Sequence, residues 1–589
     1  MPSYSSTPIL APRGAADSLV SPWPQAAGLR SLWRIRPEVR AGNLLLIVAL
    51  YLALTQNLSL AHAVARSLPQ PFGWQEWRIA ASVFVTLLNL IVLALIPLSA
   101  PRLLKPAVVL FLLVAAVCSY FMDSFGVVID RSMIVNAVRT DTREVGDLLG
   151  GPFWMHLFAF GVLPALGVLR LRLRREPLWT LLRSRVLLAA AVLLVQGSLL
   201  GLQYNELSFW GRNHREVRLL VNPTYPLYSA ARYLRSRLPS GPARPLAVIA
   251  ADATRTASAA DARPFLLVLV VGETARAQNF QLNGYARATN PQLSGLSDLV
   301  NFSEVRSCGT ATAESVPCMF SGLPRRGFSQ DRASAQQNVL DVLTRVGIAV
   351  QWWDNDSGCQ GVCVRVPTRN LEKADDPAHC AAGECRDGIL LRDLSQAGPP
   401  PGASGLLVLH MKGSHGPAYF KRYPDSARHF TPDCRDENVQ RCSREEVVNA
   451  YDNSLVYTDA VLADLIQRLR ARDDLDSAVI YVSDHGESLG ENGLYLHGLP
   501  YALAPDEQTR VPLLAWFSDG ARQTLGLDGR CLARSATAPV SHDHLFHSLL
   551  GLFSVQTGLY ESGLDLFAAC RSKPAAGASF PSGALLTKR

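Results

Sequence analysis

The stretch that decides the fold is Ala478-Val479-Ile480-Tyr481-Val482-Ser483-Asp484-His485-Gly486-Glu487-Ser488. Its first five residues are apolar and favour a buried strand, which ends directly in an acid and a histidine. Open α/β sheets present their ligands at the carboxyl ends of the strands. The apolar run 265–271 ends in the same way, in Gly272-Glu273-Thr274. Together the two runs predict one site with Glu273, Asp484 and His485, which are oxygen and nitrogen donors of the kind that zinc accepts.

Each of these turns alone has a simpler explanation, an acid that caps a strand-to-helix turn. The pattern that surrounds them favours the site. Beyond Pro264, apolar strands alternate with helix-like segments, which predicts an α/β fold whose mostly parallel sheet carries helices on both faces. The strands are expected at 265–271, 348–353, 406–410, 478–482 and 511–517.

A segment rich in hydroxyl groups lies between the first two predicted strands, Ser307-Cys308-Gly309-Thr310-Ala311-Thr312-Ala313-Glu314-Ser315-Val316-Pro317-Cys318-Met319. A hydroxyl at a helix N-terminus lies at the positive end of the helix dipole, although a lone threonine there is usually an N-cap. Next to a metal ion the same hydroxyl acquires a lowered pKa and becomes a nucleophile. One such oxygen would complete a tetrahedral site with Glu273, Asp484 and His485. The spacing alone does not choose among Thr310, Thr312 and Ser315.

The first third of the 589 residues contains five long apolar stretches, and nothing comparable follows about residue 205. A membrane span takes about 20 mostly apolar residues. The stretches are 44–60, 80–98, 106–120 (extended to about 127), 153–169 and 186–202. We therefore predict a tail at 1–42, a five-span transmembrane domain at 43–205, bridging helices and a linker at 206–263, and a catalytic domain at 264–589.

Arginine and lysine residues predict the orientation of these spans. They gather before the first span, between the second and third, and between the fourth and fifth, three segments that lie on one side of the membrane. The positive-inside rule makes that side cytoplasmic. The tail is then cytoplasmic and the long C-terminal region lies outside. The formal charge of +8 largely reflects this bias. Basic patches with interleaved aromatic residues are absent, so we expect no nucleic-acid partner.

The cysteines support the same orientation. Eight of the 11 form close pairs in the sequence after the last span: Cys308 with Cys318, Cys359 with Cys363, Cys380 with Cys385, and Cys434 with Cys442. Disulfides persist in oxidising compartments such as the periplasm. We expect these four pairs to be bonded, while Cys531 and Cys570 are candidates for a fifth, long-range bond.

Four motifs of this chain resemble those of the phosphoethanolamine transferases that modify lipid A. That group includes the mobile colistin-resistance enzymes and has the alkaline-phosphatase-like fold. The resemblance covers nearly the whole chain, including the membrane domain. The motifs lie at 272–280, 307–319, 413–417 and 483–492.

The resemblance implies roles for particular residues. Thr312 would be the nucleophile that becomes phosphoethanolaminylated, and Zn²⁺ would be held by Glu273, Thr312, Asp484 and His485. Substrate contacts would come from Ser357, His415 and His497. Asn136, Thr140 and Glu144, in the loop after the third span, are spaced so that one helix would place them on one face. A solvated polar face is the alternative, but the resemblance implies a lipid-substrate pocket.

Two positions depart from the family pattern, and two histidine positions have ambiguous roles. Gln360 stands where the family commonly has lysine, which removes a cation that would bind phosphate or carboxylate. Glu314 adds an acid two residues after Thr312.

The run 541–547 resembles a metal cluster but is better interpreted as the start of a helix. His410, at the end of a predicted strand, is either a further ligand near His415 or a core histidine.

The resemblance therefore implies an enzyme of the bacterial inner membrane. It would transfer phosphoethanolamine from phosphatidylethanolamine to lipid A through Thr312 and release diacylglycerol. Membrane lipids would be its partners, and we expect a monomer. The added cation would weaken the binding of cationic peptides such as polymyxins. The alternatives are transfer to a lipopolysaccharide core sugar or another glycan, or a periplasmic phosphatase or sulfatase-like hydrolase. Sulfatases use a Cys/Ser-x-Pro-x-Arg motif, which Thr312-Ala-Glu-Ser does not supply.

Overall fold

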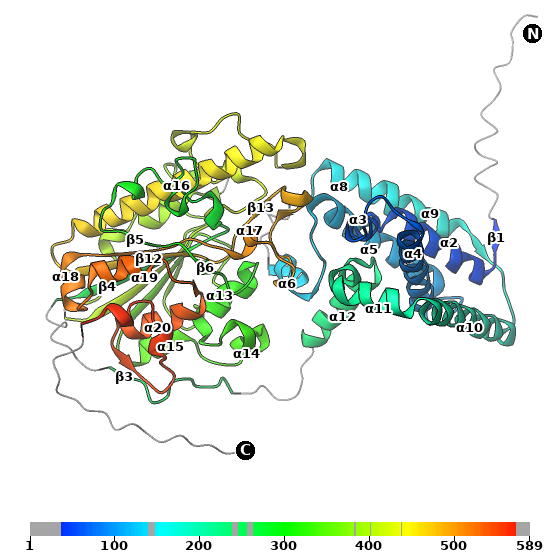
Figure 1. Cartoon of the computed structure of the whole chain (residues 1–589), viewed down its shortest axis with the longest axis horizontal. Coiled ribbons are helices and arrows are strands. Elements are labelled where there is room, and N and C mark those ends of the chain that lie inside the picture. Colours follow the sequence, from blue (N-terminus) through cyan, green and yellow to red (C-terminus); the bar gives the residue numbers. More distant parts are fainter. Residues whose placement is uncertain are drawn as a thin grey trace, which may run out of the picture.

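The structure is a computed structural model that describes residues 37–572, apart from 140–145, 147, 238–244, 256–262, 382–383, 401 and 438. Figure 1 shows two parts side by side, a helical domain formed by the N-terminal third and an α/β domain formed by the rest. Helix α6 (Arg131–Arg139) belongs to the first part by sequence and lies at the junction between the two.

A seven-stranded sheet forms the centre of the α/β domain. Its strands are β4 (Phe265–Gly272), β5 (Val300–Phe302), β7 (Ala349–Asp354), β8 (Thr368–Asn370), β11 (Ser404–His410), β12 (Asp476–Ser483) and β15 (Leu513–Phe517). Their order is β5-β15-β12-β4-β11-β7-β8. From β12 to β8 all neighbours are parallel, whereas β15 is antiparallel to both β12 and β5. The predicted strands and the mostly parallel sheet are thus confirmed.

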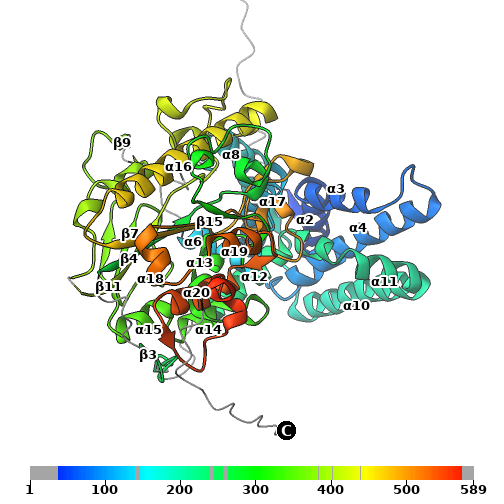
Figure 2. The ribbon, with the colours of Figure 1, turned by 60° about the vertical axis from the view of Figure 1, so that its left-hand side comes forward.

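Strand β4 is buried on both faces, as a central strand of a parallel sheet must be. Alternate side chains enter two separate cores. Leu267 and Leu269 pack with α13 (Thr312–Ser321), α15 (Val339–Arg345) and α20 (Asp543–Leu552). Leu266 and Val268 pack with the long helix α16 (Arg444–Arg470). In both views α16 covers one face of the sheet, and the other three helices cover the opposite face (Figures 1 and 2).

Within the described residues, four helical segments of the N-terminal domain are long and apolar enough to span a membrane. They are α4 (Trp74–Leu95), α5 (Leu104–Phe125), the continuous run Gly151–Arg170 and α10 (Leu178–Leu202). The run 151–170 combines α8 (Gly151–His156), a π-helical turn (Leu157–Val162) and α9 (Leu163–Arg170). These segments match the second to fifth predicted spans.

The predicted first span, at 44–60, is divided between two helices, which together are long and apolar enough to form one bent span. Helix α2 (Ala41–Thr55) ends early, and α3 (Leu58–Ser67) continues at an angle of 60°. Asn57 lies in the break, where its amide donates to Leu52 O and to Asn222 O. The amide of Asn222 in turn donates to Gln56 O and Ala115 O. Side-chain amides thus satisfy backbone groups that a break in an apolar segment would otherwise leave unpaired.

Three helices bridge the domains: α11 (Tyr204–Asn213), a 3₁₀ helix (Arg215–Leu220) and α12 (Thr224–Arg237). Pro226 lies in the first turn of α12, where the missing N–H of proline leaves no intrahelical hydrogen bond unmade.

All four cysteine pairs that are close in the sequence form disulfides, as expected, and the candidate fifth bond is present too. Each bond lies in the α/β domain, which agrees with the prediction that this part of the chain occupies an oxidising compartment. Cys118, in α5, is the free cysteine and is buried. The bonds join Cys308 to Cys318, Cys359 to Cys363, Cys380 to Cys385, Cys434 to Cys442, and Cys531 to Cys570.

Candidate active site

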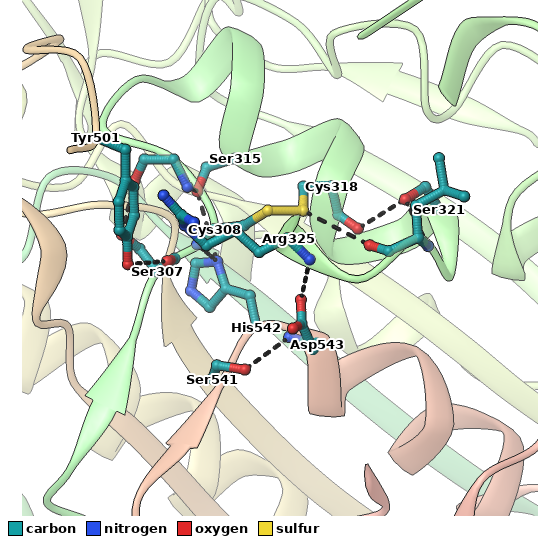
Figure 3. The surroundings of a disulfide bond; sticks show 12 residues. Ser307, Cys308, Ser315, Cys318, Ser321, Arg325, Tyr501, Ser541, His542 and Asp543 are labelled. Carbon is teal, nitrogen blue, oxygen red and sulfur yellow. Dashed lines mark hydrogen bonds between the residues drawn. A yellow bond between two sulfur atoms is a disulfide. The ribbon is translucent and has the colours of Figure 1, made fainter. Parts of the chain in front are cut away.

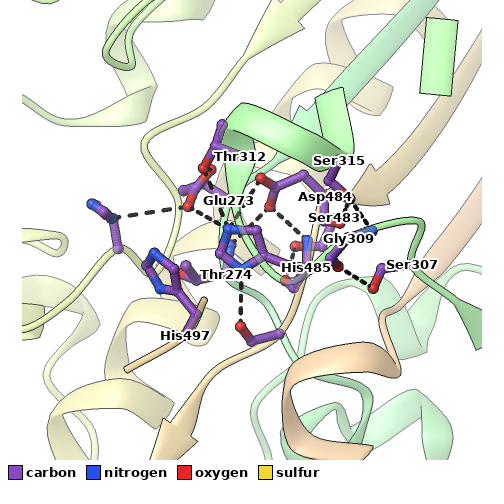
Figure 4. Close-up of polar contacts among 12 residues, drawn as sticks. Glu273, Thr274, Ser307, Gly309, Thr312, Ser315, Ser483, Asp484, His485 and His497 are labelled. Carbon is purple, nitrogen blue, oxygen red and sulfur yellow. Dashed lines mark hydrogen bonds and ion pairs between the residues drawn. The ribbon is translucent and has the colours of Figure 1, made fainter. Parts of the chain in front are cut away.

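Parallel pairing brings the acidic ends of two strands together. Gly272 of β4 lies opposite Ser483 of β12, so Glu273 and Asp484, which follow them, are neighbours. Asp484 N–H donates to Gly272 O at 2.9 Å, which continues the ladder by one residue. Thr312, the first residue of α13, points into the same space (Figure 4). The sequence prediction of one site from two strand ends is therefore confirmed in its geometry.

The four side chains form a compact buried cluster. Thr312 Oγ1 donates to Glu273 Oε2 at 3.0 Å and lies 3.3 Å from His485 Nε2. His485 Nε2 lies 3.3 Å from both Glu273 Oε1 and Asp484 Oδ2. None of the four residues is more than 6% exposed. The atoms that face one another are one hydroxyl, one imidazole nitrogen and two carboxylates.

This donor set fits a metal cation. Glu273 Oε1 and Asp484 Oδ2 are buried without a hydrogen-bond partner, which is costly for a carboxylate unless a cation lies between them. Burial, together with Asp484 and Asp356, raises the pKa of the Glu273 carboxyl well above its usual range. His485 Nδ1 lies 2.9 Å from Gly486 O, which fixes the proton there and leaves the Nε2 lone pair directed into the cluster.

The structure distinguishes among the three hydroxyl groups that the sequence left open. Thr310 Oγ1 donates to Leu499 O at 2.6 Å, away from the carboxylates. Ser315 Oγ donates to Asp484 O and accepts from Gly309 N–H, so it braces the loop. Only Thr312 of the three directs its hydroxyl at Glu273 and His485.

A disulfide and a buried histidine hold the loop before Thr312 (Figure 3). Cys308 is bonded to Cys318 of α13, so the loop is tied to the helix that it enters. Cys308 N–H donates to His542 Nδ1 at 3.1 Å, and His542 Nε2 lies 3.0 Å from Ser483 O. Burial lowers the pKa of His542 to about 4. His542 therefore links two segments, and α20 begins at Asp543, which agrees with the prediction that 541–547 is the start of a helix.

Two further histidines lie at the entrance of the cluster. The ring of His497 is 4.3 Å from the ring of His485 and 5.5 Å from that of His415. His497 Nδ1 lies 3.3 Å from Glu487 Oε2. Burial, followed by Arg422 and His497, lowers the pKa of His415 well below its usual range.

Asn136, His415 and His497 line one cavity of 310 Å³ at the junction of the two domains. Its walls are mainly apolar, and several come from the membrane domain, including Phe121, Phe125 and Met133. Of the three residues expected on one helix face, Asn136 lies in α6. Thr140 and Glu144 lie outside the described residues. Ser357 donates from Oγ to Asp356 Oδ2 at 3.3 Å and is not among the residues that line this cavity.

The two departures from the family pattern lie in different places. Gln360 has a φ of 51° in the short loop closed by Cys359 and Cys363. Glu314 lines a separate cavity of 270 Å³ between α13 and α6, together with Asp130. Burial and the negative charge of Asp130 raise the pKa of Glu314.

Three acids near the site were not anticipated: Asp354, Asp356 and Glu487. Glu273 was identified because it follows the carboxyl end of a parallel strand. The same criterion applies to the first two acids, since Asp354 ends the parallel strand β7 and Asp356 follows it. Glu487 stands two residues after His485, in the stretch Ser483-Asp484-His485-Gly486-Glu487.

Residues 85–238 match the family described as phosphoethanolamine transferase EptA/EptB, and residues 266–555 match the sulfatase family. The chain is 40% identical to phosphoethanolamine transferase EptA of Escherichia coli (strain K12), over 91% of this chain and 98% of that protein. It is 38% identical to phosphatidylethanolamine transferase Mcr-1 of Escherichia coli, over 89% and 97%. The integral membrane lipooligosaccharide phosphoethanolamine transferase A of Neisseria meningitidis is similar in structure, with a TM-score of 0.86, 36% identity and coverage of 91% and 99%. The chain belongs to the phosphoethanolamine transferase family.

Proposed function

We propose that this chain transfers phosphoethanolamine from phosphatidylethanolamine to lipid A through a phosphoethanolamine-threonine intermediate on Thr312. One observation carries the proposal: Thr312 alone among three candidate hydroxyls faces a buried cluster of metal-ligand type. Glu273, Thr312, Asp484 and His485 would hold Zn²⁺. Relatives of this chain are named for transfer of the same group, one of them as Kdo(2)-lipid A phosphoethanolamine 7''-transferase of Escherichia coli (strain K12).

The reaction requires two in-line displacements at one phosphorus. In the first, Thr312 Oγ1 gives up its proton and bonds to phosphorus while the bond to the diacylglycerol oxygen breaks, and that oxygen takes up a proton. In the second, an acceptor oxygen of lipid A gives up its proton and bonds to phosphorus while the bond to Thr312 Oγ1 breaks, and Oγ1 takes up a proton. Zinc, when bound, lowers the pKa of a coordinated hydroxyl and stabilises charge on phosphoryl oxygens.

The histidines at the entrance are suited to proton transfer. His415 is neutral at neutral pH because its pKa is lowered, so it can accept a proton from the incoming acceptor. His497 is oriented by Glu487. The junction cavity, with its apolar walls and these two histidines, would hold the donor lipid next to Thr312.

The cellular setting follows from the same features. The apolar helices, the arginine bias and the disulfides support a multi-pass protein of the bacterial inner membrane with its catalytic domain in the periplasm. The transfer would make lipid A less anionic and reduce the binding of polymyxins. We propose that the enzyme acts as a monomer.

Intact mass spectrometry of the full chain, mixed with phosphatidylethanolamine in detergent, tests the proposal. Wild-type protein should gain the mass of one phosphoethanolamine group and lose it when lipid A is added. Thr312→Ala should show no gain, while Thr310→Ala should behave like wild type. An adduct on Thr312→Ala would refute the assignment of the nucleophile. Release of phosphoethanolamine to water, with lipid A unchanged, would identify a hydrolase instead.

A further inference from the structure

A second group of buried donors lies behind Glu273, centred on His410 at the end of β11. His410 is completely buried, and its Nδ1 lies 3.2 Å from Asp354 Oδ2. Trp352 Nε1 donates to the same oxygen at 2.7 Å, which holds the carboxylate in place. Asp354 thereby orients the ring of His410 and leaves Nε2 as the ring nitrogen without a hydrogen-bond partner.

The free nitrogen points at carboxylates. His410 Nε2 has no hydrogen-bond partner and lies 3.9 Å from Asp356 Oδ2. One ligand atom from each of Glu273, Asp356 and His410 lies within 4.8 Å of the other two, and all three residues are buried. Ligand atoms held at about 2.0–2.2 Å from a metal ion lie roughly 3–4.4 Å apart, so small side-chain adjustments would close the site.

The surroundings have the organisation of a metal site. A carboxylate that accepts from one nitrogen of a histidine, while the other nitrogen faces outward, is the arrangement that orients metal-ligating histidines. The nearby ammonium of Lys412 pairs with Glu372 at 3.6 Å. Three carboxylates, Glu273, Asp354 and Asp356, thus meet one imidazole in a space without solvent, where a divalent cation would offset their mutual repulsion.

We propose that Glu273, Asp356 and His410 bind a second divalent transition-metal ion, with Glu273 as the carboxylate shared by both metal sites. The mixed oxygen and nitrogen donors suit Zn²⁺ or Mn²⁺. The ion would hold the Glu273 carboxylate in place through Asp356 and His410. The alternative occupant is a second proton on His410, which would make the ring an imidazolium between Asp354 and Asp356.

Metal counting on the full chain in detergent separates these two occupants. The protein is stripped with a chelator, reloaded with Zn²⁺, passed through a desalting column and analysed by inductively coupled plasma mass spectrometry. Asp356→Asn, which keeps the shape of the side chain, should bind one ion fewer per chain than wild type. Glu372→Gln, which alters a buried acid that faces Lys412 instead, should bind as many ions as wild type.

A second variant covers the case in which Asp356→Asn folds poorly. Asp354→Asn leaves all three ligands in place but disturbs the orientation of His410, and should weaken the second ion 10- to 100-fold. Anomalous diffraction from crystals grown with Mn²⁺ should show density between His410 and Asp356. Equal metal content in wild type and both aspartate variants, or no anomalous density there, would overturn the proposal in favour of the proton.

The test of the second site does not depend on the transfer reaction, because it measures the number of metal ions bound per chain. Thr312→Ala should retain the second ion. If the ion is absent while Thr312 still becomes modified, the proposed function stands and only the second site is rejected.

Discussion

At the scale of single residues, the position of Glu273 depends on a close backbone approach. Gly413 has a φ of 52°, and a Cβ there would lie 2.5 Å from Glu273 O and 2.9 Å from Glu273 N. The next residue, Ser414, donates its N–H to Glu273 O at 3.0 Å. Thr274, directly after Glu273, has a φ of 54°, which a β-branched residue rarely adopts. The carboxylate is thus presented by a strained turn that its neighbours hold in place.

Gly413→Ala should displace Glu273 and lower metal content and transfer together. The backbone strain alone costs about 1–3 kcal/mol, and the contact with the Glu273 backbone adds to it. Gly402→Ala is the matched control, since Gly402 has a φ of 73° but a methyl group there would meet no atom of the described residues within 4 Å. Metal content and the thermal midpoint of both variants test the prediction. Equal metal content in the two variants would contradict it.

His542 should make stability depend on pH. Its folded pKa of about 4 lies below the value of 6.5 for an unperturbed histidine, so between these pH values the unfolded chain binds a proton that the folded chain excludes. Stability is therefore complete above about pH 6.5 and falls by roughly 3 kcal/mol as the pH drops toward 4. Protonation of Nδ1 would also oppose the Cys308 N–H that donates to it.

Thermal midpoints of wild type and His542→Gln, measured between pH 4.5 and 7, check this expectation. The variant should be less stable at pH 7 but should lose less stability on acidification. His429→Gln, which removes an exposed histidine, should keep the pH dependence of wild type. Parallel curves for wild type and His542→Gln would rule out His542 as the source.

At the scale of elements, α13 and the loop before it behave as one unit. Nine of the ten residues of α13 are buried, and the helix starts at Thr312. The loop is tied to the helix by Cys308–Cys318 and is braced by Ser315. The positive end of the helix dipole thus lies at Thr312, where a developing alkoxide is favoured.

Removal of the Cys308–Cys318 bond should reduce transfer more than its effect on stability explains. A bond that closes a loop of this size contributes about 2–4 kcal/mol, and this one also positions Thr312. The double variant Cys308→Ala/Cys318→Ala should lose most adduct formation while it remains folded at low temperature. Cys531→Ala/Cys570→Ala removes a disulfide that spans 39 residues and does not contact the cluster, so it should lose stability but keep adduct formation. Equal adduct formation in both double variants would contradict the positioning role.

At the scale of the whole molecule, the active-site entrance is shared between two domains. The cavity at the junction combines Phe121 and Met133 from the membrane domain with His415 and His497 from the α/β domain. Arg131 of α6 pairs with Asp331 at 3.1 Å, and Arg66 of α3 donates to Asn492 O at 3.1 Å. These contacts join the membrane domain to the α/β domain that carries the buried cluster.

Met133→Trp should fill the junction cavity and block the lipid substrate selectively. Adduct formation from phosphatidylethanolamine should fall at least tenfold, while slow cleavage of a small water-soluble phosphoethanolamine ester should persist because the cluster is untouched. Met155→Trp, at an exposed position on α8, is the control and should leave both reactions unchanged. Loss of both reactions in Met133→Trp would mean that the substitution disturbs the cluster instead of the lipid path.

The sequence by itself determined the class of the fold and the main donors of the site. Continuous apolar runs such as 265–271 and 478–482 identify buried parallel strands, and a parallel sheet places whatever follows those runs at one edge. That rule uses only neighbours along the chain, and it is sufficient to predict that Glu273, Asp484 and His485 lie at one edge of the sheet. Pairing of cysteines that are close in the sequence is also a local property. The four disulfides expected on this basis are all present, including those that end at Cys385 and Cys442.

Only the tertiary structure decided among Thr310, Thr312 and Ser315, because the direction of a hydroxyl depends on its distant partners, Leu499, Glu273 and Asp484. The break at Asn57 was hidden for the same reason, since Asn222, 165 residues away, satisfies it. The grouping of Asp356, His410 and Glu273 likewise required the strand order, which brings β7, β11 and β4 together from distant parts of the chain. Hydropathy and spacing report on neighbours along the chain, whereas these features depend on contacts between residues far apart in it.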